Sequence, residues 1–233
     1  MNDLHGSRFL IIGASSGIGK ALASSLRDSG AEVHTASRTT PEDMETPEHH
    51  QQCDVTSDDV EIEVPDALDG LVYCPGSITL AQFNKISDET FIKDFQINVM
   101  GAVRCIRHAL PALQKGKGSV LLFSTVAVSR GMSFHASIAS AKGALEGLTR
   151  ALAAEFAPRS VRVNAVAPSI VDTPLASGIL SNDKRREASE KRHPLSRVGS
   201  TDDIVAAAKY LLAPSASWVT GQILHVDGGL SVI

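Results

Sequence analysis

The sequence predicts an α/β domain built on a doubly wound, mostly parallel β-sheet, and three observations support this fold class. Short apolar runs alternate along the chain with longer helical patterns, as in repeated βαβ units. The run Ser119–Phe123 is almost entirely apolar, which is typical of a strand covered on both faces. The length of 233 residues suits one such sheet with helices on both sides. We therefore expect a single domain over residues 1–233 with about seven strands.

The first half of the chain is predicted to contain four strands and the first helices. The helix after the first strand spans Lys20–Arg27 and ends at Gly30. A polar connection, Thr39–His49, follows the second strand, and Val55–Asp69 contains a proline and leaves little room for a helix. A long helical pattern begins at Ser87 and continues to Leu113. The expected strands are Phe9–Ile12, Glu32–Ser37, Gln51–Asp54 and Leu71–Cys74.

The second half continues the alternation. A long helix rich in alanine and leucine, Ala136–Ala157, is stopped by Pro158. A second helix is expected over Asp202–Leu212. The expected strands are Ser119–Phe123, Val161–Val166 and Ile223–Val226. These segments complete a parallel sheet with right-handed crossovers.

Composition excludes several classes of protein. The chain has 22 Lys and Arg against 26 Asp and Glu, a formal charge of −4, so no general attraction to nucleic acid is expected. No apolar stretch approaches the roughly 20 residues that cross a bilayer. The polar first six residues argue against a secretory signal, and the three cysteines contain no CxxC pair. We expect a cytoplasmic protein with reduced thiols.

A glycine-rich loop follows the first predicted strand. Its sequence, Gly13-Ala14-Ser15-Ser16-Gly17-Ile18-Gly19, leads directly into a helix. Unpaired backbone N–H groups at the positive end of a helix dipole stabilise a pyrophosphate, and glycines let the backbone approach it. The GxxxGxG spacing differs from the commoner GxGxxG fingerprint. The loop predicts a phosphate-binding site.

With this loop the sequence resembles the short-chain dehydrogenase/reductase family, whose fold is Rossmann-like. The usual Thr before the first glycine is Ile12 here, and Tyr73-Cys74-Pro75-Gly76 keeps only the glycine of the family's Asn-Asn-Ala-Gly. Further matching segments are Cys53–Thr56, Ile97–Gly101, Arg162–Pro168 and Thr220–Gly229. The resemblance covers the full chain.

The resemblance implies a nicotinamide cofactor. The residues it assigns to cofactor binding are Gly13, Ser15, Ser16, Gly17, Ile18, Gly19, Ser37, Arg38, Asp54, Val55, Gly76, Asn98, Lys142, Pro168 and Thr173. Ser37 stands where relatives that use NAD tend to carry Asp, and Arg38 follows it. Because a 2′-phosphate requires a cation, we expect NADP(H) rather than NAD(H). The alternative is that Arg38 is a solvated loop residue.

The catalytic pattern of the family is incomplete. In the family a Tyr donates the proton, a Lys four residues later assists it, a Ser 13 residues earlier orients the substrate and an Asn completes a proton relay. Lys142 and Asn98 match, and Thr125 stands in the place of the Ser. The position of the Tyr holds Ile138, whose side chain carries no proton to donate. Ser124, beside Thr125, is expected to point the opposite way.

Several groups are alternatives to the missing acid. His135 has a suitable ordinary pKa, and it lies near Ile138 if the helix extends that far. A water held by Lys142, Asn98 and Thr125 is a second route. Ser137 is a third candidate, and Ser140 is expected to face away. The remaining hypothesis is that Ile138 packs over the nicotinamide and that the protein binds cofactor without reducing ordinary carbonyls.

Residues 169–199 correspond to the family's substrate lid. Ser169 replaces a usual glycine, and residues 184–197 hold six Lys or Arg against two Glu. This excess either binds an anionic substrate, such as an acyl thioester on a carrier, or forms a solvated helix face. His49, His50 and Cys53 are too few to predict a metal site.

The resemblance also implies a homodimer or homotetramer. In relatives the helices matching 87–113 and 136–157 form dimer faces, and the C-terminal segment completes a tetramer. The leading hypothesis is an NADP(H)-dependent oxidoreductase that reduces a ketone or β-ketoacyl carbonyl, or oxidises the matching alcohol, with a non-standard proton donor. The rival is a weak or inactive cofactor-binding homologue with a regulatory or structural role.

Overall fold

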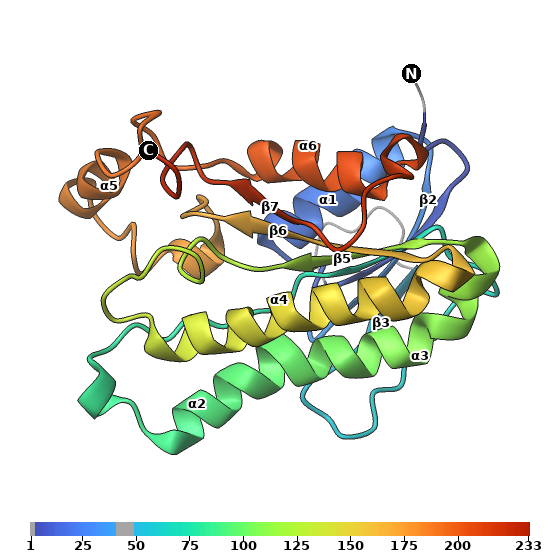
Figure 1. Ribbon diagram of the computed structural model, residues 1–233, viewed down its shortest axis with the longest axis horizontal. Helices are drawn as coiled ribbons and strands as arrows, with labels where there is room; N and C mark the ends of the chain where they lie inside the picture. Colours follow the sequence, from blue (N-terminus) through green and yellow to red (C-terminus); the bar gives the residue numbers. More distant parts are fainter. Residues whose placement is uncertain (1–2, 41–48) are drawn as a thin grey trace.

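The computed structural model describes residues 3–40 and 49–233, and in these ranges a parallel sheet of seven strands forms the centre of the molecule (Figure 1). The strand order is β3-β2-β1-β4-β5-β6-β7, and every neighbouring pair is parallel. The strands are β1 (Arg8–Ile12), β2 (Glu32–Ser37), β3 (His50–Gln52), β4 (Gly70–Tyr73), β5 (Ser119–Phe123), β6 (Arg162–Pro168) and β7 (Ile223–Val226). The predicted fold class is confirmed.

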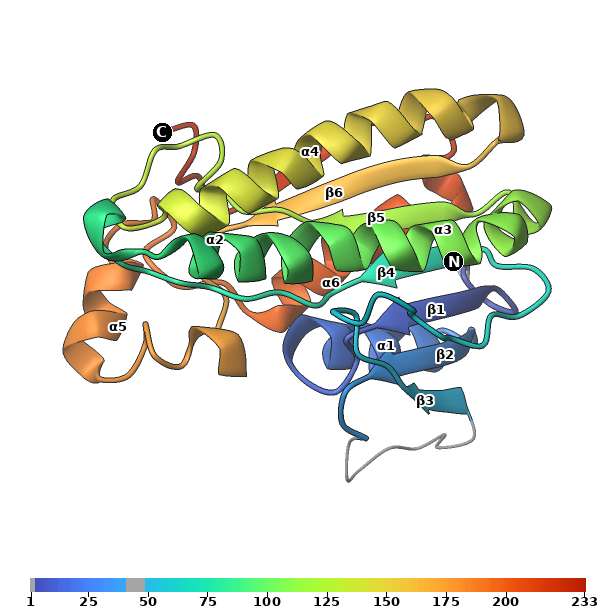
Figure 2. The same cartoon turned by 90° about the horizontal axis from the view of Figure 1, so that it is seen from below.

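Helices cover both faces of the sheet. Helices α1 and α6 lie together on one face, and α2, α3 and α4 cover the other (Figures 1 and 2). The helices are α1 (Gly17–Asp28), α2 (Asp88–Phe95), α3 (Gly101–Gly116), α4 (Ala136–Phe156), α5 (Asp183–Glu190) and α6 (Thr201–Leu212). A π-helical segment, η3 (Gln96–Met100), joins α2 to α3. Short 3₁₀ helices within the described residues are η2 (Phe83–Lys85), η4 (Ala157–Arg159), η5 (Pro174–Ala176) and η6 (Pro214–Ala216).

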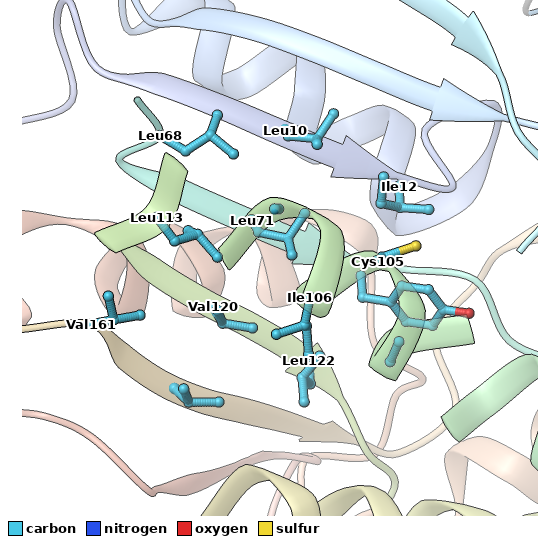
Figure 3. Packing of buried hydrophobic residues seen from close by; sticks show 14 of the residues in the cluster. Leu10, Ile12, Leu68, Leu71, Cys105, Ile106, Leu113, Val120, Leu122 and Val161 are labelled. Atoms are coloured by element: carbon cyan, nitrogen blue, oxygen red, sulfur yellow. The ribbon is translucent and has the colours of Figure 1, made fainter. Parts of the chain in front are cut away.

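The apolar strands are explained by the two helical layers. Alternate residues of a strand point to opposite faces, so Leu10 and Ile12 of β1 pack on the side of α3, while Phe9 and Ile11 pack on the side of α1 and α6. Figure 3 shows the first of these clusters, in which residues of β1, β4 and β5 meet Ile106 and others from α3. Burial of one such side chain contributes about 1.5–3 kcal/mol.

Most boundaries differ from the prediction by a few residues, and three differences are informative. The third strand is His50–Gln52, because the Asp54 carboxylate accepts hydrogen bonds from Thr56 in a turn. The sixth strand extends to Pro168. The long pattern from Ser87 is not one α-helix but α2, η3 and α3 in succession. No helix forms over residues 55–69, all of which are described, as predicted. Most of the polar connection 39–49 lies outside the described residues.

The topology determines where a ligand can bind. The chain adds β2 and β3 on one side of β1 and then crosses to β4 on the other, so the strand order reverses between β1 and β4. Ligands of doubly wound sheets bind at the carboxyl ends of the strands beside such a switch point. The segment after β6, with η5 and α5, lies at this end (Figure 1).

Candidate active site

A cleft of about 680 Å³ opens at the carboxyl ends of the strands. All of the residues predicted to bind the cofactor line it, as do Thr125, His135 and Ile138. The structure therefore brings together residues that are far apart in the sequence, from Gly13 to Thr173. This is the geometric condition for a shared site.

The glycine loop leaves backbone N–H groups open to the cleft. Gly13 and Gly17 have φ values of +83° and +55°, which other residues rarely adopt. Ser16, the N-cap of α1, makes no side-chain capping hydrogen bond, so the first N–H groups of this helix remain available to an anion. A Cβ at Gly19 would collide with the carbonyl of Gly13. The loop fits a pyrophosphate.

The part of the cleft beside β2 and β3, where the adenosine of a dinucleotide is expected, contains a cation and an anion. Arg38 follows β2, is exposed and lines the cleft. Ser37 is buried and donates a hydrogen bond to the carbonyl of Thr39 at 2.8 Å. Hydrogen bonds from Thr56, with a smaller contribution from Arg38, lower the pKa of the Asp54 carboxyl. Arg38 is therefore close enough to Asp54 to interact with its charge.

Lys142 is the central ionisable group on the floor of the cleft. It lies on α4, is 8% exposed and lines the cleft. Burial lowers the pKa of the Lys142 ammonium to about 8, while the charges of Cys74 and Asp94 act in the opposite direction. Burial also raises the pKa of the Cys74 thiol to about 12. Lys142 can thus gain and lose a proton close to neutral pH.

Asn98 lies in the π-helical segment η3 and faces the same space. π-Helical segments are frequent at functional sites, because the extra residue changes the direction of a side chain. The amide nitrogen donates to the carbonyl of Asp94 at 2.8 Å and to Ser77 Oγ at 3.0 Å. Its Oδ1 is buried and has no partner within the described residues. At the position of a Cβ on Gly76, Asn98 Oδ1 would be 3.2 Å away and Lys142 Nζ 3.8 Å away.

The hydroxyls at the end of β5 differ in what they can do. Ser124 is buried and donates to Glu146 Oε1 at 2.8 Å. Thr125 is half-buried, and its Oγ1 accepts from the backbone of Ala127 at 3.3 Å, so its proton remains free for a ligand. Ile138 is 3% exposed and lines the cleft one turn before Lys142. Thr125 is the hydroxyl that can hydrogen-bond a substrate.

The candidate substitute acids occupy different surroundings. The helix does not extend back to His135 as the interpretation required; α4 begins at Ala136, with His135 as its N-cap. His135 lines the cleft, and its Nδ1 donates to the carbonyl of Ser133 at 2.7 Å. Ser137 is buried and donates to Asp94 Oδ2 at 2.6 Å. Ser140 is exposed and bonds the carbonyl of Ala136.

On the substrate side, ion pairs account for half of the basic residues. Within 184–197, Arg186, Lys191 and Arg197 pair with Asp172, Glu187 and Asp203 at 2.7, 2.6 and 2.6 Å. These pairs are exposed at the surface, as expected for a solvated helix face. Arg192 alone of the six basic residues in this described segment lines the cleft. The same wall includes the apolar side chains of Ile170, Leu175, Ile179 and Leu230.

Sequence reasoning missed a serine–histidine pair in this wall. His193 is 4% exposed and its Nδ1 donates to the carbonyl of Ser189 at 2.8 Å. Its Nε2 therefore accepts from Ser169 Oγ, also at 2.8 Å, when the ring is neutral. Ser169 lines the cleft. The departure of Ser169 from the family glycine was the signal that could have directed attention to this place.

Three further features concern the described residues only. In residues 3–40 and 49–233 no group of three His, Cys, Asp or Glu side chains is arranged to hold a metal ion. Over the same ranges, no helix is both long and apolar enough to cross a membrane. Cys53, Cys74 and Cys105 are free thiols.

The fold and the cleft define the class of doubly wound proteins that bind a dinucleotide at the switch point of a parallel sheet. The family model described as enoyl-(acyl carrier protein) reductase matches residues 13–231. A tropinone reductase homolog of Arabidopsis thaliana is 33% identical over 252 residues, which cover 99% of this chain and 92% of the relative.

Two solved structures have the same architecture. The aldohexose dehydrogenase of Thermoplasma acidophilum, in ligand-free form, is 28% identical with a TM-score of 0.89, over 100% of this chain and 96% of that chain. ElxO with NADP bound is 26% identical with a TM-score of 0.84, over 97% and 98% of the two chains. The chain belongs to the short-chain dehydrogenase/reductase family, whose members are oxidoreductases that bind a nicotinamide cofactor.

Proposed function

We propose that the protein is an NADP(H)-dependent oxidoreductase for a carbonyl/alcohol pair, in which Lys142 takes the part of the proton donor. The observation that carries this proposal is the pair of groups on the cleft floor. Lys142 Nζ and the unpartnered Asn98 Oδ1 are both buried and lie within 4 Å of one point above Gly76. A buried acceptor without a partner is costly, so a ligand or water that bonds it is favoured there.

The residues proposed to bind the cofactor suit the chemistry of NADP(H). The N–H groups of the glycine loop, Gly13 to Gly19, would hold the pyrophosphate, and Arg38 the 2′-phosphate. Thr173 and Pro168 line the cleft where the nicotinamide is expected. Bound there, the nicotinamide supplies or accepts a hydride. The bound NADP of the ElxO structure supports the same cofactor for this chain, at 26% identity.

The proton step needs a donor for the oxygen that becomes negative when the carbonyl is reduced. With a pKa of about 8, the Lys142 ammonium is protonated at pH 7 and is a strong enough acid to give its proton to that oxygen. An N–H bond of Lys142 breaks, an O–H bond of the product forms, and the amine is left neutral. Thr125 donates a second hydrogen bond to the same oxygen. A water beside Gly76 that accepts from Lys142 Nζ would give the unpartnered Asn98 Oδ1 a donor.

His135 is a weaker candidate for the acid. It lines the cleft as the N-cap of α4, and one of its ring nitrogens is bonded to the Ser133 carbonyl. An unchanged pH profile in His135→Ala would remove it from consideration.

The substrate class is a small carbonyl compound with an apolar body, including acyl thioesters. The apolar wall formed by Ile170, Leu175 and Ile179 supports this, and Arg192 at the same wall offers one cation to an anionic group. The proposal is tested by NADPH oxidation with a panel of ketones, β-ketoacyl thioesters and quinones. If none is reduced by the wild type, the rival hypothesis of a cofactor-binding protein without turnover replaces it.

Arg38→Ala is expected to weaken NADPH binding by about tenfold to a hundredfold, since hydrogen bonds to a charged group contribute about 1.5–3 kcal/mol. NADH has no 2′-phosphate, so its affinity should not fall. Calorimetric titration of both cofactors into both proteins measures the effect. Arg159→Ala, on an exposed residue at the end of η4, is the matched control. Equal loss for NADH and NADPH would contradict the assignment.

We further propose that the protein assembles as a homodimer through α2 and α4. Phe91, Ile92 and Phe95 of α2 line a hollow of about 420 Å³ together with Ser137 and other residues of α4. Ile92 is 59% exposed and Phe95 40%. An exposed apolar patch of this kind is typical of an interaction surface. Light scattering of the purified protein is expected to give a dimer or tetramer mass, and a monomer mass at micromolar concentration would contradict the proposal.

A further inference from the structure

We propose that Asp94 is a positioning residue for the proton step: through Ser77 it fixes the amide of Asn98 toward Lys142, and its negative charge favours the protonated form of Lys142. The inference rests on the proposed function of Lys142. Asp94 was not among the residues that the sequence suggested. It lies on α2, outside the lining of the cleft, and reaches the site through other side chains.

Asp94 belongs to a buried polar cluster beneath the cleft floor. The side chain is 1% exposed, although aspartate is rarely buried without partners. Ser77 Oγ donates to Oδ1 at 2.5 Å, and Ser137 Oγ donates to Oδ2 at 2.6 Å. Thr79 Oγ1 is a more distant donor to Oδ1, at 3.5 Å. The Asp94 carboxylate is therefore bonded by Ser77, in the loop after β4, and by Ser137 of α4.

The hydrogen bonds of this cluster have only one consistent direction. A carboxylate accepts, so the Ser77 hydroxyl points its proton at Asp94 and offers a lone pair on its other side. That lone pair accepts from Asn98 Nδ2 at 3.0 Å, and the second amide proton goes to the backbone carbonyl of Asp94 at 2.8 Å. Both protons of the amide are then used. Oδ1 is left without a partner on the side of Lys142.

The charge of Asp94 acts on the same site. Two charges act on the Lys142 ammonium, those of Cys74 after β4 and Asp94 on α2. Two further titratable groups lie on or next to α4: His135, which lines the same cleft, and Glu146, one turn after Lys142. The Cys74 thiol has a pKa raised to about 12 by burial, so it is neutral where Lys142 titrates. Glu146 is bonded by Ser124 and Arg150.

Asp94 is therefore the anion that opposes the effect of burial on Lys142. A purely structural alternative is that Asp94 only ties α2 to α4 through Ser137. The two explanations predict different behaviour of Lys142. If the charge of Asp94 acts on Lys142, substitution of Asp94 changes the pH at which Lys142 titrates, and substitution of Ser137 does not.

The test measures the pH at which Lys142 becomes reactive. The cofactor-free protein is labelled briefly with acetic anhydride across a pH series, and mass spectrometry quantifies the peptide that contains Lys142. The wild type is expected to show a midpoint at about pH 8. Asp94→Asn should lower the midpoint by about one pH unit or more, because a nearby opposite charge is removed.

Matched variants separate the roles. Asp88→Asn makes the same substitution at an exposed position of α2 and should leave the midpoint at the wild-type value. Ser137→Ala removes only the hydrogen bond between α4 and α2, and it should also leave the midpoint at the wild-type value. Ser77→Ala keeps the charge, so the midpoint should stay, while NADPH oxidation should fall about tenfold as the Asn98 amide loses its fixed orientation.

The outcomes also distinguish this inference from the proposed function. Labelling requires no turnover, so it reports on Asp94 even if the wild type oxidises no NADPH, in which case the proposed function fails by itself. Coincident midpoints in Asp94→Asn and the wild type would overturn the inference and leave the function standing. A midpoint shift in Ser137→Ala equal to that in Asp94→Asn would also overturn it. Circular dichroism of each variant identifies any that fails to fold, and Ser77→Ala then supplies the test by its activity.

Discussion

Lys142→Met is expected to lower NADPH oxidation by about 10²- to 10⁴-fold and, at the same time, to raise the melting temperature at pH 7. The first effect follows from the loss of a general acid, whose contribution is typically of that size. The second follows from burial, because an ammonium group at 8% exposure is less favourable there than an apolar side chain of similar length.

The sign of the stability effect depends on pH. In the folded protein the pKa of Lys142 is lowered from 10.5 to about 8, so between these two values the unfolded chain binds more protons than the folded one. Stability therefore rises with pH across this window. Below about pH 8 the cost of burying the charge is complete, and above about pH 10.5 it disappears. The stabilising effect of Lys142→Met should be largest at neutral pH and fade at alkaline pH.

Steady-state kinetics and thermal denaturation at pH 7 and at pH 10 measure both effects. Lys93→Met, on an exposed lysine of α2, is the matched control and should change neither. Retained turnover in Lys142→Met would contradict the assignment of the proton donor. A lower melting temperature at pH 7 would instead show that Lys142 contributes to stability through its charge.

The architecture was predictable because two layers of helices demand apolar side chains on both faces of every central strand. The almost entirely apolar run Ser119–Phe123 is typical of a covered strand, and it forms β5 with every residue buried. The π-helical segment was not predictable, since one extra residue in a turn hardly changes the apolar spacing between Ser87 and Leu113. It is the feature that directs Asn98 into the cleft.

Only those residues of the candidate site that match the family's motifs could be predicted from the sequence. Lys142, Asn98 and Thr125 were assigned from their match to the family pattern, and the structure brings them to one cleft. Asp94 could not be found in this way, because a single aspartate in an amphipathic helix resembles a solvated residue until its partners on other elements are known. The same limit applies to His193, whose partner Ser169 is 24 residues away.

Ile138→Tyr is expected to raise the rate of carbonyl reduction by up to about 10²-fold, the lower end of the contribution of a positioned general acid, because Lys142 already supplies a proton in the wild type. Ile138 lines the cleft four residues before Lys142 on α4, so a phenol there would project from the same helix face as the lysine. The positive charge of Lys142 would lower the pKa of the phenol and make it a better donor. Because the cleft has a volume of about 680 Å³, the larger ring has space toward the ligand and need not displace the core.

Ile138→Phe is the control that separates the hydroxyl from the ring. Both variants introduce the same bulk, and only the tyrosine can donate a proton. The comparison of kcat for wild type, Ile138→Phe and Ile138→Tyr, with NADPH affinity measured for each, isolates the chemical contribution. Equal rates in the two variants would contradict the proposed role of position 138. If the wild type is silent and Ile138→Tyr alone turns over, the native chain is a cofactor-binding protein that has lost one proton donor and kept the rest of the site.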